Sequence, residues 1–199
     1  PPFAVLNDVC FIDTLEDRDK RAGMAEAVKV ALIRDGAFFE WMQENAAALG
    51  RFERPAMAYM IRRCAELHLA HIATSGDPFE YGSARPLDFG HWAAHKLEVL
   101  TDHALRHGEA VAIGIALDSA YSVESGLLNP EDFDSICRLF DDVGLACTHE
   151  LLGHTGPDGR LLIEVGLEEF RQHLGGDLTV TMIEGVGLGV EINEVCKQA

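Results

Sequence analysis

Apolar residues recur three or four positions apart over most of this chain, and this spacing constrains the fold more than any other feature. Between residues 55 and 74, Met57, Met60, Ile61, Cys64 and Leu67 share one face at helical spacing. The same periodicity, interrupted by Gly, Pro or Asp, predicts helices over residues 13–34, 37–49, 55–74, 88–101, 108–125, 130–143 and 159–174.

Few segments suit a β-strand. Residues 178–183 read LTVTMI and form the best candidate, while residues 4–9 suggest a brief strand or an extended lead-in. Residues 75–86 are rich in Gly, Pro, Ser and Asp, which is typical of a loop. The sequence therefore predicts a mainly α fold: one domain over residues 1–199, a bundle of about six to seven helices with one or two short strands.

Net charge limits the partners that such a domain could bind. The 16 Lys and Arg against 33 Asp and Glu give a formal charge of −17. Nucleic acids and anionic membranes attract positive surfaces, so neither is expected as a partner. A phosphorylated substrate would need local cations or a metal. Residues 1–100 have 11 basic and 15 acidic side chains, a net of −4, whereas residues 101–199 have 5 and 18, a net of −13, so an anion site is expected in the first half.

The cysteines and the apolar runs indicate the compartment. Five widely spaced cysteines without a CxxC pair are typical of reduced thiols in the cytoplasm. No apolar run approaches the length of a membrane span, and no signal-peptide pattern is present. The chain starts at Pro1 without an initiator Met, and we interpret it as part of a larger protein.

Histidines lie in two pairs at i, i+4 spacing: His91 with His95, and His103 with His107. This spacing places both imidazoles of a pair on one helix face, the geometry of a two-histidine metal site. A single pair of this kind also arises by chance among surface histidines, but two pairs around one turn favour the metal interpretation. The HExxH signature of metalloproteases is absent, because Trp92 follows His91 and Ala104 follows His103.

The glycine-rich residues 185–190, which read GVGLGV, follow the expected strand and invite comparison with a dinucleotide-binding loop. However, the third glycine of that motif would fall at Val190, and only nine residues follow. A βαβ unit with its acidic ribose contact needs more. A turn that closes the domain is the favoured interpretation.

Three blocks of sequence carry a resemblance to a known family. Residues 23–29 read GMAEAVK, residues 89–98 read FGHWAAHKLE, and residues 107–114 read HGEAVAIG. In this order and spacing they resemble the 3-dehydroquinate synthase family, over nearly the whole chain. The resemblance implies the helical, metal-binding C-terminal domain of a sugar phosphate cyclase, whose separate N-terminal domain binds NAD and is absent from this chain.

The resemblance also implies a ligand set and two catalytic groups. The family's metal ligands fall on Glu26, His91 and His107. One carboxylate and two imidazoles leave an open position for substrate oxygens, as in a catalytic zinc site; zinc is the default metal, and cobalt or iron would fit the same donors. His95 corresponds to a family histidine that contacts substrate hydroxyls or passes a proton. Lys29 corresponds to the family lysine that faces the substrate.

The residues expected to read the substrate depart from the family pattern. Asp88 replaces the usual Asn, and position 84 is Ala where an arginine is usual, with Arg85 one residue later. His68 replaces a lysine, and Arg171 falls on a late lysine pair. The resemblance assigns Lys29, Arg85, Asp88 and Arg171 to substrate binding. Because the Asp88 carboxylate would repel an anion at close range, the substrate is expected to differ from that of typical members.

The leading hypothesis is the metal-binding half of a 3-dehydroquinate synthase-like cyclase, a carbon–oxygen lyase of the shikimate-pathway type. Such enzymes use NAD and a metal to eliminate phosphate from a ketose phosphate, such as 3-deoxy-D-arabino-heptulosonate 7-phosphate, and close the ring by an intramolecular aldol addition. The resemblance further implies a homodimer, and the chain alone is expected to be inactive. Two alternatives remain open: a domain of the metal-dependent alcohol or glycerol dehydrogenases, which mostly use Asp where this chain has Glu26, and a non-catalytic metal-binding remnant.

Overall fold

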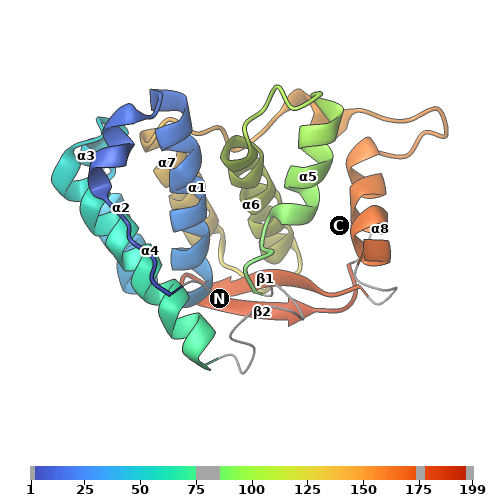
Figure 1. The fold of residues 1–199 in the computed structure, drawn as a ribbon. Coiled ribbons are helices and arrows are strands. Elements are labelled where there is room, and N and C mark those ends of the chain that lie inside the picture. Colours follow the sequence, from blue (N-terminus) through green and yellow to red (C-terminus); the bar gives the residue numbers. More distant parts are fainter. Residues whose placement is uncertain (1–2, 75–85, 174–177, 196–199) are drawn as a thin grey trace.

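The computed structural model describes residues 3–74, 86–173 and 178–195, and these fold into a helical bundle with one small sheet (Figure 1). The described helices are α1 (Asp17–Arg34), α2 (Gly36–Glu44), α3 (Ala46–Gly50), α4 (Arg54–Thr74), α5 (His91–Leu100), α6 (His107–Glu124), α7 (Pro130–Asp142) and α8 (Leu162–His173), with short 3-10 helices at Val9–Thr14 and Glu150–Gly153. The predicted mainly α fold with short strands is confirmed.

Helix α6 forms the centre of the bundle and packs against α1, α5, α7 and the sheet (Figure 1). It is rich in alanine and glycine, and most of its residues from 108 to 122 are buried. Small side chains allow neighbouring helices to approach closely, and the larger side chains of the core, such as Phe39, Phe89 and Phe140, fill the space around them.

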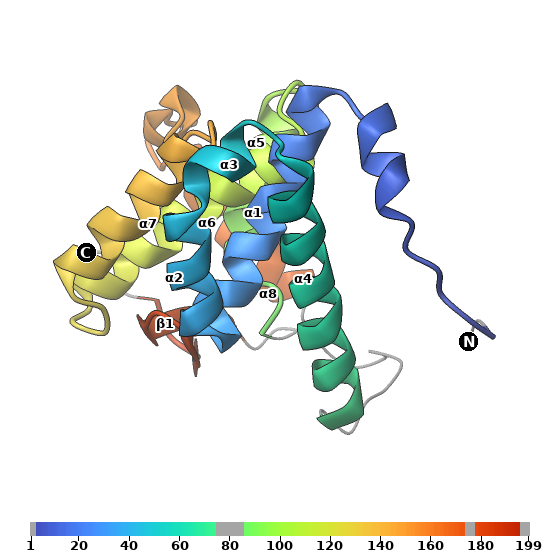
Figure 2. The same cartoon turned by 90° about the vertical axis from the view of Figure 1, so that its left-hand side faces the viewer.

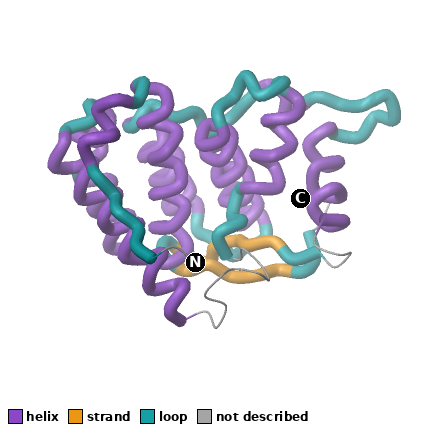
Figure 3. Tube along the Cα trace, viewed as in Figure 1, coloured by secondary structure: helices purple, strands orange, loops and turns teal. Residues whose placement is uncertain are grey.

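The sheet is an antiparallel hairpin of β1 (Val180–Gly185) and β2 (Leu188–Ile192), which crosses one end of the helices (Figure 3). Val180 pairs with Ile192 at the open end. Val186 and Gly187 of the glycine-rich stretch form the turn, so the turn interpretation is confirmed and the dinucleotide-loop alternative is not supported. Gly187 has a φ of 86° and its N–H donates to the Leu32 carbonyl at 2.7 Å, which anchors the turn to the end of α1.

The starts of α1 and α8, and the continuity of the second predicted helix, differ from the sequence prediction. α1 begins at Asp17 and not near Thr14, because the Thr14 hydroxyl donates to Phe11 O and residues 9–14 form a 3-10 helix. α8 begins at Leu162, since Gly159 takes a φ of 79° in a turn that Thr155 and Leu161 bridge. The predicted helix over residues 37–49 is two helices, α2 and α3, that meet at Asn45.

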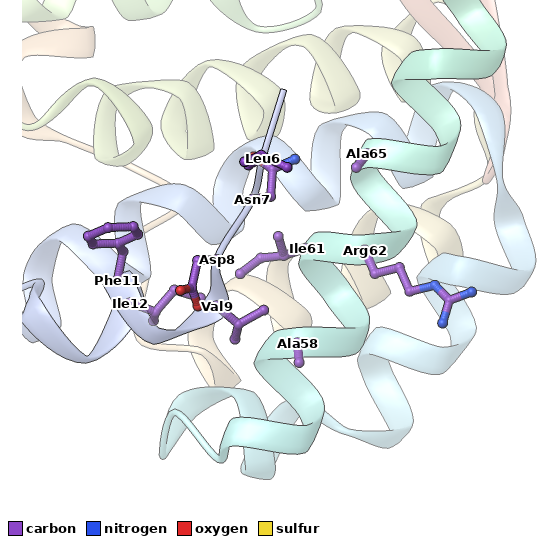
Figure 4. Close-up of a pocket in the computed structure, with 10 residues that line it drawn as sticks. All are labelled: Leu6, Asn7, Asp8, Val9, Phe11, Ile12, Ala58, Ile61, Arg62 and Ala65. Carbon is purple, nitrogen blue, oxygen red and sulfur yellow. The ribbon is translucent and has the colours of Figure 1, made fainter. Parts of the chain in front are cut away.

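The segment before α1 leaves the bundle on the side of α4 (Figure 2). Phe3, Val5, Leu6 and Phe11 are exposed there. Between this segment and α4 lies a mainly apolar groove of about 590 Å³ (Figure 4), lined by Leu6, Asn7, Asp8, Val9, Phe11, Ile12, Ala58, Ile61, Arg62 and Ala65.

Candidate metal centre

The first element of the site is the close crossing of α1 and α6, which brings Glu26 near His107. Gly108 makes this crossing possible, because a Cβ at this position would collide with the backbone oxygen of Ala22. Arg18 of α1 adds a second link: its guanidinium donates to both carboxylate oxygens of Glu109 at 2.6 Å and to the Ala104 carbonyl at 2.7 Å. The first turn of α6, which carries His107, is therefore fixed against α1.

The second element is the tight turn at residues 86–90, which delivers His91 at the first position of α5. Gly90 has a φ of 78° and lies directly against Gly114 and Ile115 of α6, where a Cβ would clash. The sequence predicts this helix from residue 88, but α5 begins later, at His91. The Asp88 side chain instead accepts a hydrogen bond from the Thr181 hydroxyl of β1 at 2.6 Å.

Glu26, His91 and His107 converge on one point. Oε1 of Glu26 lies 3.7 Å from Nε2 of His91 and 3.4 Å from Nε2 of His107, and the ligand atoms of the three side chains all lie within 4.8 Å of one another. Oε1 of Glu26 is buried and has no hydrogen-bond partner among the described residues. A buried carboxylate oxygen without a partner is costly, so its place between two imidazoles indicates a position for a cation.

The Nδ1 atoms of both imidazoles are hydrogen-bonded as they are in histidines that bind metals through Nε2. Nδ1 of His91 lies 3.1 Å from the Phe89 carbonyl, and Nδ1 of His107 lies 3.2 Å from Oε2 of Glu98. Carbonyl and carboxylate oxygens accept, so Nδ1 carries the proton in each ring. Each Nε2 then presents its lone pair to the centre, which is the arrangement that orients histidines on metals.

Electrostatics keep His91 and Glu26 in the protonation states that a metal requires. Burial, together with the Lys29 ammonium, lowers the pKa of His91 to about 4, so this imidazole is neutral at neutral pH. Burial acts to raise the pKa of Glu26, but the adjacent Lys29 and the two histidines outweigh it and hold that pKa below its usual value. The carboxylate therefore stays ionised.

Lys29 and His95 lie beside these ligands. Lys29 is only 4% exposed, and its Nζ is 2.6 Å from Oε2 of Glu26. The exposed ring of His95 lies 5.7 Å from that of His91 and 6.0 Å from that of His107. His95 also groups with Glu98 and His107 as a second possible set of ligands that shares His107 with the first.

Two of the other residues assigned to the substrate have described contacts: Asp88 with Thr181, and Arg171 with Glu168. Arg171 lies on α8 and pairs with Glu168, with Nη2 2.6 Å from Oε1. Arg85 and Ala84 lie outside the described residues. His68 lines a hollow of about 170 Å³ beside Glu26 and Lys29, which also contains Arg34 and His71, whose side chains are 3.0 Å apart.

Two residues of the site were missed in the sequence. Glu98 holds His107, and its position seven residues after His91 places it on the same face of α5. Asp118 is fully buried in α6, where it accepts from the N–H of Gly90 and from the indole N–H of Trp92. The sequence offers one signal for Asp118: it is a single acidic residue directly after the apolar run 110–117.

The fold and the site define a helical domain with a two-histidine, one-carboxylate constellation suited to a divalent cation. The sequence profile of the family described as 3-dehydroquinate synthase C-terminal matches residues 23–163, which contain all three of these side chains. The chain belongs to this family.

Solved structures of sugar phosphate cyclases share the fold. A 2-epi-5-epi-valiolone synthase, ValA, from Streptomyces hygroscopicus subsp. jinggangensis 5008, with NAD+ and Zn2+ bound, matches 96% of this chain at 28% identity with a TM-score of 0.84. A 2-deoxy-scyllo-inosose synthase complexed with carbaglucose-6-phosphate, NAD+ and Co2+ matches 94% at 19% identity with a TM-score of 0.70, which shows the fold alone. The chain spans 51% of the length of each of these relatives.

Among the described helices, none combines the length and the apolar character needed to cross a membrane. The described cysteines, Cys10, Cys64, Cys137 and Cys147, are all free thiols.

Proposed function

We propose that this chain is the metal-binding catalytic half of a sugar phosphate cyclase. The observation that carries the proposal is the convergence of Glu26, His91 and His107, with the buried Oε1 of Glu26 facing both Nε2 atoms and no hydrogen-bond donor. Zinc fits this nitrogen and oxygen donor set, and cobalt or iron are compatible with it. When bound, the metal supplies a Lewis acid that polarises hydroxyl or carbonyl oxygens of the substrate.

The side chains around the ligands then position the substrate and move protons. Lys29 holds Oε2 of Glu26, which fixes the carboxylate plane and leaves Oε1 for the metal. The exposed His95 stands next to both ligand histidines, where its Nδ1 or Nε2 is available to take a proton from a substrate hydroxyl and return it. His95 and Lys29 are therefore the proposed catalytic groups of this half.

The proposed substrate is a ketose phosphate, of which 3-deoxy-D-arabino-heptulosonate 7-phosphate is the family example. The proposed reaction is phosphate elimination followed by an intramolecular aldol closure, a lyase reaction that in the namesake family serves the shikimate pathway. Lys29, Arg85, Asp88 and Arg171 remain the proposed substrate contacts. The carboxylate of Asp88, fixed by Thr181, disfavours a substrate with a second anionic group there and favours a neutral, hydroxylated end.

The proposed reaction also needs NAD and a second domain that binds it. We propose that residues 1–199 are one domain, that NAD is bound by an N-terminal domain, and that the chain alone is inactive; the 28% identical relative, of which this chain spans about half, has NAD+ bound. A homodimer and a cytoplasmic location complete the proposal. The exposed apolar groove beside α4 and the free thiols support these two points.

A metal titration of this chain tests the centre directly. The variants Glu26→Gln, His91→Ala and His107→Ala are expected to lose the tight zinc site in competition with a chromophoric chelator. His154→Ala, which removes an exposed histidine elsewhere, is the matched control and is expected to bind as the unchanged chain does. Unchanged zinc content in all three variants would rule out the assignment.

An assay of the parent two-domain protein tests the reaction. With NAD+, zinc and a heptulose phosphate, a cyclase releases phosphate without net reduction of NAD+. Net NADH formation would identify an alcohol or glycerol dehydrogenase, and tight zinc binding without turnover of any sugar phosphate would identify a metal-binding remnant. Turnover by residues 1–199 alone would contradict the two-domain proposal.

A further inference from the structure

Asp118 is a buried carboxylate with an unusual pair of partners. Only 1% of the residue is exposed, and it lies on α6, away from the three proposed ligands in sequence. Its Oδ2 accepts from the backbone N–H of Gly90 at 2.8 Å, and its Oδ1 accepts from Nε1–H of Trp92 at 2.8 Å. Gly90 and Trp92 are the residues directly before and after His91.

Within the described residues, no side chain caps the start of α5. Its N-cap residue, Gly90, has no side chain to accept from the N–H groups of the first turn, and its φ of 78° lies in the left-handed region that glycine adopts without steric cost. In most helices a Ser, Thr, Asp or Asn at this position fixes the first turn. The Asp118 carboxylate of α6 does not accept from these first-turn N–H groups; it holds the residues on both sides of His91 instead, through the backbone N–H of Gly90 and the indole N–H of Trp92.

The number of hydrogen-bond acceptors explains why this residue is an aspartate. Its two donors reach different oxygens, so two acceptor oxygens are needed, and a carboxylate supplies them. An amide would satisfy one donor and turn its own NH2 group towards the other. A neutral core residue would cost less to bury, so the carboxylate indicates that the positions of Gly90 and Trp92 matter.

We propose that Asp118 is a positioning residue of the metal centre: by holding Gly90 and Trp92 it fixes the turn so that Nε2 of His91 faces Oε1 of Glu26 before a metal binds. The proposal rests on the function proposed above. Asp118 does not contact the ligands; it acts through the backbone of residues 90–92, and the Phe89 carbonyl then orients the ring. Loss of this carboxylate is therefore expected to weaken metal binding and to loosen the coordination geometry.

The test measures zinc affinity by chelator competition and the visible absorption of bound cobalt, with unfolding of the metal-free chain recorded in parallel. Asp118→Asn is expected to raise the zinc Kd about 10- to 100-fold, the usual effect of losing a group that orients a ligand, and to change the cobalt spectrum. Trp92→Phe removes one donor and leaves Gly90 held, so a smaller increase is expected. In the double variant Asp118→Asn/Trp92→Phe, the introduced amide no longer faces the indole N–H. Its zinc affinity is therefore expected to be higher than that of Asp118→Asn alone.

Ser119→Ala is the matched control, because the Ser119 side chain is buried on the same helix and its hydroxyl has no partner in the part of the chain that the structure describes. Its zinc Kd is expected to equal that of the unchanged chain. If Asp118→Asn lowers thermal stability but keeps the original zinc Kd and cobalt spectrum, Asp118 is merely structural and the proposal is overturned. If Asp118→Asn does not fold, Trp92→Phe decides, and an unchanged Kd and spectrum overturn the proposal.

The controls separate this inference from the proposed function. If the unchanged chain binds zinc and His91→Ala does not, the centre exists, and the Asp118 variants alone decide the inference. If the unchanged chain binds zinc no better than His91→Ala, the metal centre itself is wrong and both proposals fall.

Discussion

The buried Lys29 pairs with the half-buried Glu26 one helical step away: Nζ of Lys29 lies 2.6 Å from Oε2 of Glu26, while Oε1 of the same carboxylate faces the two imidazoles. One oxygen is thus held by an ammonium and the other is left for a cation. Because Lys29 favours the ionised carboxylate, we expect it to set the lowest pH at which Glu26 can still bind a metal.

Lys29→Met is expected to narrow the pH range of metal binding. Without the ammonium, burial dominates and the pKa of Glu26 rises, so protons compete with the metal at higher pH. The midpoint for zinc release, measured by dialysis across a pH series, is expected to move upwards. Lys20→Met is the control, since Lys20 makes the same i, i+3 contact with Asp17 on this helix. Equal midpoints for all three chains would contradict the prediction.

Glu98→Gln is expected to weaken zinc binding about 10-fold, because an amide oxygen is a poorer acceptor for the Nδ1–H of His107 and the imidazole becomes a weaker ligand. Chelator competition measures the effect. Glu169→Gln is a suitable control, as Glu169 pairs with Lys96 of the same helix and makes no described contact with the ligands. A Glu98 variant that binds zinc as tightly as the control would argue against this role.

Gly108→Ala tests the helix crossing that brings Glu26 and His107 together. The new Cβ would strike the backbone of Ala22, so α1 and α6 must separate, at about 1–3 kcal/mol of unfolding free energy. Zinc affinity is expected to fall with it. Gly23→Ala gives the opposite sign: nothing lies within 4 Å of a Cβ there, and the better helix former should add ~0.5–1 kcal/mol. Denaturant unfolding of both variants decides; equal destabilisation would refute this account of Gly108.

Local signals in the sequence predict the helices whose ends depend on local chemistry. α4 and α7 begin within a residue of prediction, because Pro55 and Pro130 mark their first turns. The start of α5 was predicted too early. It depends on hydrogen bonds to residues that are remote in sequence: Thr181 donates to Asp88, and Asp118 accepts from Gly90. Helical periodicity contains no information on such contacts.

In the candidate site, too, the sequence predicts some residues and not others. The motifs name Glu26, His91 and His107, and the structure brings these side chains together, although their role as ligands stays a prediction. Glu98 and Asp118 belong to the same centre but match no expected ligand spacing. They act through His107 and through Gly90, so only the packing of α5 against α6 reveals them.

The buried carboxylate of Asp118 also predicts a pH dependence of stability. Burial, with a smaller contribution from the charge of Asp88, raises the pKa of Asp118 to about 7, whereas an exposed aspartate titrates near 3.8. Between these values the folded chain holds a proton that the unfolded chain has lost. The contribution of Asp118 to the free energy of unfolding is therefore largest below pH ~4, falls as the pH rises, and is constant above pH ~7.

The comparison that isolates this contribution is the metal-free chain against Asp118→Asn, because other carboxylates, such as Glu109 with its lowered pKa, act in the opposite direction in both. As the pH rises from ~4 to ~7, the unchanged chain is expected to lose unfolding free energy relative to Asp118→Asn. The loss is up to about 4 kcal/mol, at about 1.4 kcal/mol per pKa unit. Urea denaturation at several pH values measures it. A difference that stays constant over this range would mean that Asp118 is ionised throughout and that its two hydrogen bonds fully offset the cost of burial.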